Sequence, residues 1–313
     1  DTEAPVLSSH VVNAVLDRSG IDPARVDDVY LGVGNHWNTQ SYNLGRLTVH
    51  ASKLPNSVGG FTLDRKCSSG LNAIALAARG GIADEIDVAV AGGMETISMT
   101  LNKFAPGWRN RSQAVIDADP YAYMAMIETA EVVAERYGVT REAQDAFAAL
   151  SQQRAGAAQA AGKFNDEIVP ITVEKSLKDK EGNETGRETV TVSADEGVRG
   201  DTTAEGLSLL RPVFKDGMVI KEGKHITAGN ASQLSDGASA QLVMDLATAQ
   251  KEGVPVLGVY RGFLVSGCDP DEMGIGPVFA IPKVLARLGL KVSDIDLWEL
   301  NEAFAVQVIY CRD

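Results

Sequence analysis

A continuous apolar run, IDVAVAGG at residues 86–93, constrains the fold of this 313-residue chain most strongly. Short runs without alternating polar residues are typical of strands that helices cover on both faces. Helical apolar spacing occurs at 7–18 and 67–82, and strand-like segments occur at 29–33 and 59–66. Strands that alternate with helices predict an α/β layered sheet.

The pattern changes over residues 99–227, which we interpret as an inserted, mainly helical domain. Helices are predicted at 121–137 and at 140–162, where Thr140 is the expected N-cap. The polar, turn-rich stretch 173–197 predicts an exposed hairpin and loop.

An α/β alternation returns towards the C-terminus, over 235–253, 256–265 and 276–290, and 294–310 predicts a strand running into a helix. A weak similarity between the two α/β parts suggests an internal duplication whose second half is incomplete. The predicted division is 1–98 as an N-terminal half completed by about 228–255, 99–227 as the inserted loop domain, and 256–313 as the start of a C-terminal half.

Charge and cysteine content argue against several classes of protein. A nucleic-acid partner needs basic patches, whereas the net charge here is −13 at pH 7. No apolar run has the length of a transmembrane helix, so no membrane insertion is predicted. Three widely separated cysteines make a poor disulfide framework, so we expect a reducing compartment and a cytoplasmic protein. The scattered histidines lack the spacing of metal ligands, and no metal site is predicted.

The segment DRKCSSGLNAIALAA at 64–78 is the most informative for chemistry. It predicts a strand leading into Cys67, then small residues and a helix. Unpaired N–H groups and the helix dipole favour a thiolate at such a position, which makes Cys67 a candidate nucleophile. A buried structural cysteine is the alternative interpretation.

For two further segments, the sequence allows more than one role. Residues 226–240, ITAGNASQLSDGASA, have little side-chain bulk, so their backbone could approach an extended cofactor closely or form a tight loop before a helix. In WELNEAFA at 298–305, Asn301 and Glu302 lie between a predicted strand and an apolar helix. Asn301 could project from the sheet edge or act as the helix N-cap.

Together these segments resemble the thiolase family, with motifs that occur in order and cover the chain nearly end to end. They are DRKCSSGLNAIALAA, AGGMETIS (91–98), MIETAE (126–131), LRPVF (210–214), TAGNASQLSDGASA (227–240), GIGPV (274–278) and WELNEAFA.

The resemblance implies a duplicated layered α/β/α/β/α fold with an inserted loop domain. It implies an acyl-CoA C-acyltransferase that condenses acyl-CoA molecules, or cleaves 3-oxoacyl-CoA with CoA, through an acyl-cysteine intermediate. Coenzyme A and acyl-CoA are then substrates, no cofactor stays bound, and self-association into a dimer or tetramer is expected.

The resemblance also implies roles for individual residues. Cys67 matches the acylated nucleophile, and Asn301 matches the residue that holds a water in the oxyanion hole. The positions implied in contacts with CoA or the acyl group are Ser232 at the pantetheine arm, Arg199 and Phe214 in the loop domain, Met126 in a pocket wall, and Ala303 and Phe304 along the acyl pocket.

The sequence departs from the family pattern after WELNEAFA, where the family has a Gly-His-Pro and a Cys-x-Gly-Gly-Gly segment. None of the histidines is followed by proline, and Cys268 and Cys311 lie outside glycine-rich turns. We therefore expect a chain that lacks both termini of the family and is inactive by itself. The alternative is a catalytically inactive thiolase-like protein that binds CoA esters or lipids. A decarboxylating ketosynthase is disfavoured, because it uses paired histidines.

Overall fold

The computed structural model describes residues 2–102, 105, 107, 109–181 and 183–313. They form two compact units, each assembled from separate stretches of the chain. Unit 1 comprises Asp1–Pro106, Ile168–Ala194 and Leu234–Arg261, and unit 2 comprises Gly107–Glu167, Asp195–Gln233 and Gly262–Asp313. The division predicted from the sequence motifs follows other boundaries and stays a prediction.

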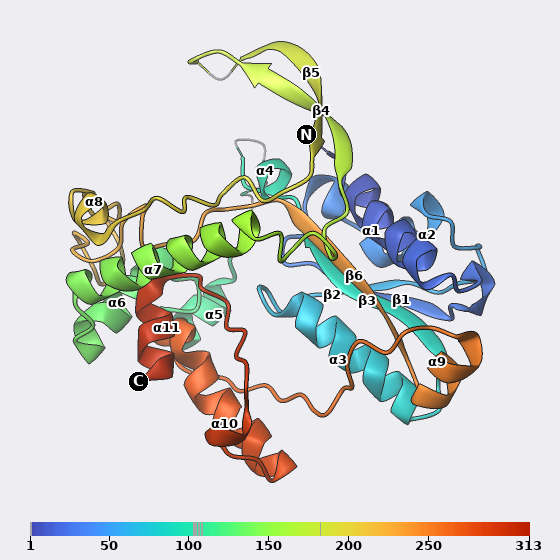
Figure 1. The fold of residues 1–313 in the computed structure, drawn as a ribbon. Coiled ribbons are helices and arrows are strands. Elements are labelled where there is room, and N and C mark those ends of the chain that lie inside the picture. Colours follow the sequence, from blue (N-terminus) through green and yellow to red (C-terminus); the bar gives the residue numbers. More distant parts are fainter. Residues whose placement is uncertain (1, 103–104, 106, 108, 182) are drawn as a thin grey trace. The chain divides into compact units, whose positions relative to one another are not determined.

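Unit 1 is built on a four-stranded sheet with the strand order β2-β1-β3-β6 (Figure 1). Strands β1 (Asp28–Gly32), β2 (Phe61–Leu63) and β3 (Val88–Glu95) are parallel, whereas β6 (Gly237–Met244) pairs antiparallel with β3. The apolar run predicted as a buried strand is β3, which lies between β1 and β6. The predicted α/β class is confirmed.

Helices α1 and α2 pack on one face of this sheet and α3 packs on the other, and unit 1 contains further short helices and turns. The helices are α1 (Ala4–Ser19), α2 (Leu44–Ala51), α3 (Ser69–Ile82), α4 (Ile97–Thr100) and α9 (Leu246–Glu252), with 3₁₀ turns η1 (Pro23–Arg25) and η2 (Asn38–Gln40). Each predicted helix in this part of the chain is present with small shifts of its ends, as expected from local periodicity.

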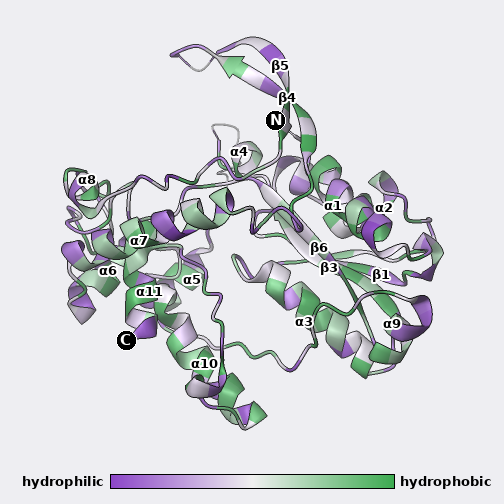
Figure 2. Cartoon of the chain, in the orientation of Figure 1, coloured by the Kyte–Doolittle hydropathy of each residue, from purple (hydrophilic) through white to green (hydrophobic). Residues whose placement is uncertain are grey.

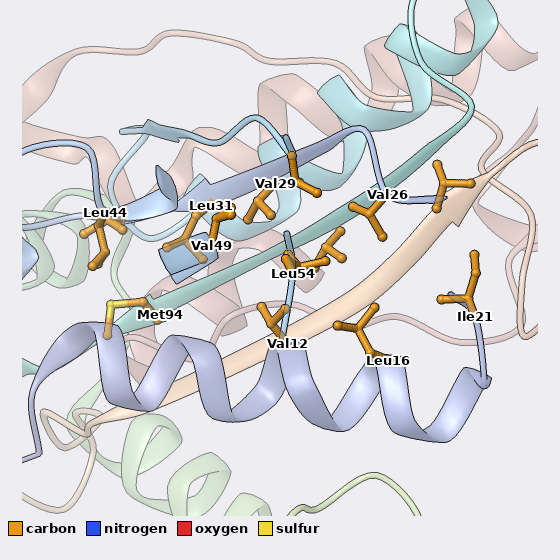
Figure 3. Packing of buried hydrophobic residues seen from close by; sticks show 14 of the residues in the cluster. Val12, Leu16, Ile21, Val26, Val29, Leu31, Leu44, Val49, Leu54 and Met94 are labelled. Carbon is orange, nitrogen blue, oxygen red and sulfur yellow. The ribbon is translucent and has the colours of Figure 1, made fainter. Parts of the chain in front are cut away.

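Alternate residues of β3 point into two separate cores, because successive side chains of a strand leave opposite faces. Val90, opposite Val29 of β1 and Leu242 of β6, belongs to a core between the sheet and helices α1 and α2 (Figure 3). Ala91 belongs to the other core, with Ala77 of α3. Small side chains on that face bring α3 close to the sheet.

A hairpin of β4 (Ile171–Lys178) and β5 (Glu184–Val192) groups with unit 1 as a separate two-stranded sheet. Hydrophobic and hydrophilic residues are interspersed along it (Figure 2), and most of its described side chains are exposed. The exposed hairpin predicted within 173–197 is confirmed.

The regular elements of unit 2 are helical throughout its described residues. They are α5 (Gln113–Ala118), α6 (Met126–Tyr137), α7 (Arg141–Ala160), α8 (Ala204–Ser208), η3 (Pro270–Ile275), α10 (Gly276–Leu288), η4 (Val292–Asp294) and α11 (Ala305–Arg312). Gly138 ends α6 with a φ of 67°, and the predicted cap Thr140 accepts a hydrogen bond from the Ala143 N–H. None of the described helices combines the length and apolar composition that a membrane span requires.

Three predicted elements differ from the structure. Residues 256–265 and 295–300 form no strand, because no described strand lies beside them to pair with their backbone groups. Leu257 and Leu297, which belong to these two segments, are 98% and 75% exposed. The helix expected from residue 121 begins only at Met126.

Candidate active site

Cys67 lies on a tight turn between β2 and α3 of unit 1. Lys66, the residue before it, has a φ of 47°, in the left-handed region that residues other than glycine rarely adopt. Helix α3 begins at Ser69 with Ser68 at its N-cap, and the Cys67 thiol is free and exposed. The predicted position of Cys67 at the start of a helix is therefore confirmed, and the buried-cysteine alternative is wrong.

The two serines that follow Cys67 hold this turn in shape. Ser69 is buried, and its Oγ accepts a hydrogen bond from Arg65 N–H (2.7 Å) and donates one to the Lys66 carbonyl (2.6 Å). Ser68 Oγ donates to the Arg65 carbonyl at 2.9 Å. These bonds satisfy backbone groups that the turn removes from the sheet.

Close backbone packing fixes the start of α3 against the sheet. A Cβ placed on Gly32 of β1 would lie 2.3 Å from the carbonyl carbon of Ser69. A Cβ on Gly93 of β3 would lie 3.0 Å from the Cα of Gly70. The turn that carries Cys67 thus rests directly on two strands, which leaves little room for it to move.

Charged groups surround the turn. Lys66 Nζ lies 2.7 Å from Asp64 Oδ2, and His36 Nε2 lies 3.6 Å from the same oxygen. Partial burial raises the pKa of Asp64, but the hydrogen bonds and the charge of Lys66 outweigh it, so the pKa lies below its usual value. Asp64 therefore stays ionised and holds the Lys66 side chain.

In unit 2, the structure brings together two of the segments that the sequence singled out. Residues 230–232 run antiparallel to 303–305, with an isolated bridge between Ala231 and Phe304. Ser232 N–H donates to the Ala303 carbonyl, and the Ala305 N–H donates to the Asn230 carbonyl, each at 2.9 Å.

Asn230 ties this pair of segments to α7. Its buried side chain accepts from the Thr227 N–H at 2.8 Å and donates to the His225 carbonyl at 2.9 Å and to Asp145 Oδ1 at 3.0 Å. Asp145 in turn pairs with Arg141 at 2.7 Å. The asparagine of the small-residue segment therefore has a structural role in forming a tight loop, which was one of the two interpretations left open.

Asn301 is exposed, and its carbonyl accepts a hydrogen bond from Gln307 Nε2 at 3.1 Å. Helix α11 begins at Ala305 with Phe304 at the N-cap position, so the interpretation of Asn301 as the helix N-cap is wrong. The neighbouring Glu302 accepts from Ser151 Oγ of α7 at 2.5 Å. The Asn301 side chain thus remains available to solvent.

The remaining candidate residues also lie in unit 2. Arg199 and Ser232 are exposed, Phe214 is half-buried, and Met126 at the start of α6 is 40% exposed. Ala303 and Phe304 are half-buried, and Phe304 packs against the core of unit 2. Cys67, in unit 1, is the candidate that belongs to the other unit.

Sequence reasoning missed two buried carboxylates of α6, although MIETAE was quoted as a motif. Glu128 accepts from the Val219 and Ile220 N–H groups at 2.6 and 3.1 Å. Glu131, which is 0% exposed, accepts from the Ile226 N–H at 2.8 Å. Acidic residues three positions apart on an otherwise apolar helix face were the available signal.

The other two cysteines differ in their surroundings from Cys67. Cys311 is half-buried, and burial raises the pKa of its thiol to about 11. Partial burial, together with nearby acidic groups, raises the pKa of Cys268. Both thiols are therefore less readily ionised than an ordinary cysteine.

The fold and the site define an α/β protein that presents a free, exposed cysteine on a strained strand-to-helix turn, where its thiol can act as a nucleophile. Two family models match the chain, "Thiolase, N-terminal domain" at residues 1–247 and "Thiolase, C-terminal domain" at residues 254–313. The chain belongs to the thiolase family.

Individual relatives agree with this. The peroxisomal 3-ketoacyl-CoA thiolase A of Rattus norvegicus is 43% identical over 314 residues, which are 99% of this chain and 69% of the relative. The acetyl-CoA acetyltransferase of Chromobacterium violaceum is 40% identical over 317 residues, which are 98% of this chain and 76% of the relative.

Solved structures give the same result. Human mitochondrial 3-ketoacyl-CoA thiolase superposes with a TM-score of 0.83 at 34% identity, over 100% of this chain and 78% of that one. The Bacillus anthracis acetyl-CoA acetyltransferase superposes with a TM-score of 0.82 at 36% identity, over 98% of this chain and 76% of that one. The predicted family, fold class and acyltransferase type of enzyme are confirmed, and the non-catalytic alternative is not favoured.

Proposed function

We propose that acyl groups pass between CoA thioesters through an acyl-Cys67 intermediate, and that the inactivity expected of this chain by itself concerns the complete reaction and not the acylation of Cys67. The observation that carries the proposal is the exposed thiol of Cys67 on the strained turn before α3. The names of the relatives, 3-ketoacyl-CoA thiolase and acetyl-CoA acetyltransferase, support CoA thioesters as substrates.

The chemistry is a double displacement at one sulfur. The Cys67 thiolate attacks the thioester carbonyl, the bond from that carbon to the CoA sulfur breaks, and CoA leaves as a thiol after taking up a proton. In the second half, another acyl-CoA that has lost its α-proton attacks the acyl carbon through its α-carbon, and the bond from that carbon to the Cys67 sulfur breaks. In the cleavage direction, Cys67 attacks the 3-oxo carbon of a 3-oxoacyl-CoA, the bond between carbons 2 and 3 breaks, and the released acyl-CoA takes up a proton at its α-carbon. The thiol of free CoA then loses its proton and takes the acyl group from Cys67. Each oxyanion needs hydrogen-bond donors, and loss of one such donor typically costs about 3–4 kcal/mol.

The roles implied for the other residues remain proposals. Asn301 is proposed to hold the oxyanion water, and its exposed side chain supports this. The residues proposed to contact CoA or the acyl group are Ser232, Arg199, Phe214, Met126, Ala303 and Phe304. The hydrogen bond between the Ser232 N–H and the Ala303 carbonyl supports a common binding surface for these two residues.

Acylation of Cys67 can be tested directly. The full chain is incubated with radiolabelled acetyl-CoA, digested, and its peptides are separated under conditions that preserve thioesters. Label is expected on the peptide with Cys67, is expected to vanish in Cys67→Ala, and is expected to persist in the matched variant Cys268→Ala. Label that is absent from the Cys67 peptide, or that survives in Cys67→Ala, would overturn the covalent mechanism.

Oligomeric state and location are further proposals. A dimer or tetramer is proposed from the family resemblance, and light scattering on a sizing column would measure it. A cytoplasmic location is proposed from the unpaired cysteines, although several relatives carry the word peroxisomal in their names. A role in fatty acid metabolism follows if 3-oxoacyl-CoA is cleaved faster than it is formed.

A further inference from the structure

A polar network lies at the end of β3, on the same side of the sheet as the Cys67 turn. Gln40 of η2 is fully buried, and its side chain bonds both to the Glu95 carboxylate and to the N–H and hydroxyl of Thr96. The other oxygen of Glu95 accepts a hydrogen bond from the Gly34 N–H at 2.9 Å. Glu95 thus joins the loop after β1 to the end of β3.

Gly34 connects this hydrogen-bond network to Lys66, the residue before Cys67. The Gly34 carbonyl accepts a hydrogen bond from Lys66 Nζ at 2.9 Å, so both polar groups of Gly34 are held, one by Glu95 and one by Lys66. A Cβ on Gly34 would lie 3.0 Å from Glu95 Oε2, so a glycine allows the carboxylate to approach. Lys66 is also the residue with the left-handed φ of 47° that directs the chain into Cys67.

We propose that Glu95 is a positioning residue for acyl transfer at Cys67, an inference that rests on the proposed function. Glu95 fixes Gly34, and Gly34 together with Asp64 fixes the Lys66 side chain. Lys66 is thereby kept in a left-handed backbone conformation that is unfavourable by itself. Without Glu95 the turn relaxes towards an ordinary φ and the Cys67 sulfur moves from its reactive position. Glu95 acts through Lys66 and does not touch the reacting atoms.

The chain offers a matched control in the same unit. Asp27 Oδ2 accepts the N–H groups of Asp87 (2.8 Å) and Val88 (3.0 Å) at the beginning of β3, the opposite end of the strand from Glu95. Removal of either carboxylate leaves backbone N–H groups without their acceptor. Only the loss of Glu95 should change the turn that carries Cys67.

The experiment compares Glu95→Ala, Glu95→Gln and Asp27→Ala in the full chain. Three quantities are measured: the rate of acyl-Cys67 formation from acetyl-CoA, the rate of Cys67 alkylation by iodoacetamide across pH 6 to 9, and the melting temperature. Glu95→Ala should lower acylation by about 10- to 100-fold, the range expected for a misplacement of about 1 Å. Glu95→Gln, which keeps an acceptor for Gly34, should recover most of this loss, and Asp27→Ala should lower the melting temperature with little change in either rate.

A second arm tests the route through Lys66. Lys66→Met keeps the length of the side chain but removes its hydrogen bond to the Gly34 carbonyl together with its ion pair to Asp64, so it should lower acylation at least as much. In the double variant Glu95→Ala/Lys66→Met, the acylation rate should fall by less than the product of the two single decreases. Both substitutions break the same hydrogen-bonded chain from Glu95 through Gly34 to Lys66, so their effects are not independent. Full additivity, or equal effects of Glu95→Ala and Asp27→Ala on the rates, would overturn the proposal. If the wild-type chain forms no acyl-Cys67, the proposed function fails, and the alkylation rates still decide the role of Glu95.

Discussion

Replacement of Gly32 by alanine should damage both stability and acyl transfer, because the end of β1 carries the start of α3. The added Cβ would lie 2.3 Å from the Ser69 carbonyl carbon, 2.4 Å from the Gly70 nitrogen and 2.5 Å from the Ser69 oxygen. All three atoms are backbone, so no side chain can rotate away. The contact is short of ordinary van der Waals distance by about 1 Å, and the helix start must move by a comparable amount.

The magnitudes follow from this displacement. Overpacking of a tight interior typically costs about 1–3 kcal/mol, and we expect a loss of that size in the free energy of unfolding of Gly32→Ala. A shift of about 1 Å at the nucleophile is expected to lower acylation of Cys67 by about 100-fold. Urea titration measures the first quantity, and time-resolved mass analysis of the protein with acetyl-CoA measures the second.

Gly20→Ala provides the control. Gly20 ends α1 with a φ of 69°, and a Cβ there would meet no atom within 4 Å. Its cost of about 1 kcal/mol comes from the left-handed backbone alone, and acylation should be unchanged. If Gly32→Ala is as stable as the wild type, or if it acylates as fast as Gly20→Ala, the reasoning from backbone packing is wrong.

Other predictions concern the reactivity of the three cysteines and two side chains of α6. With one equivalent of iodoacetamide, the exposed Cys67 should react before Cys311, whose pKa burial raises to about 11, and before Cys268, whose pKa is also raised by burial; peptide mapping that finds Cys311 modified first contradicts this. Burial raises the pKa of Glu128, but hydrogen bonds from the backbone N–H groups of Val219, Met218 and Ile220 outweigh it, and the pKa lies below the value of 4.5 that is usual for a glutamate. The carboxylate therefore stabilises the fold above that pH, and the stability gap between wild type and Glu128→Gln should shrink as the pH falls from 7 towards 3 in urea titrations; a constant gap refutes it. The hydrogen bond to Glu272, aided by burial, raises the pKa of Tyr137 to about 12, so its contribution is present below pH 10 and is lost as the pH rises through 12. Tyr137→Phe should thus cost about 1 kcal/mol at pH 7, and an unfolding free energy equal to that of the wild type would contradict this.

Much of the fold could be predicted because local signals act within a few residues. The apolar run at 86–93 forms β3. Gly138 ends α6 and Thr140 begins α7, as their capping chemistry predicts. The same reasoning placed Cys67 at the start of α3. It failed for 256–265 and 295–300, because an apolar segment becomes a strand only when a neighbouring strand pairs with it.

The candidate site likewise has one part that local sequence signals indicate and another part that they do not. Cys67, its serines and the helix behind it are contiguous, so the sequence could indicate the nucleophile. The hydrogen bond from the Gly34 N–H to Glu95 joins residues 61 positions apart, and the hydrogen bond from the Val219 N–H to Glu128 joins residues 91 positions apart. No periodicity or motif links such residues.

The sequence by itself determined most of the helices and the central strand β3, the position of the reactive sulfur in the chain, and the family to which the chain belongs. Only the tertiary structure decided that Lys66 adopts a left-handed backbone, that Gly34 is held from both sides, and that 230–232 lies against 303–305. The physical reason is that periodicity and caps depend on neighbours along the chain. Strain, buried hydrogen bonds and close backbone contacts depend on neighbours in space, which the fold alone supplies.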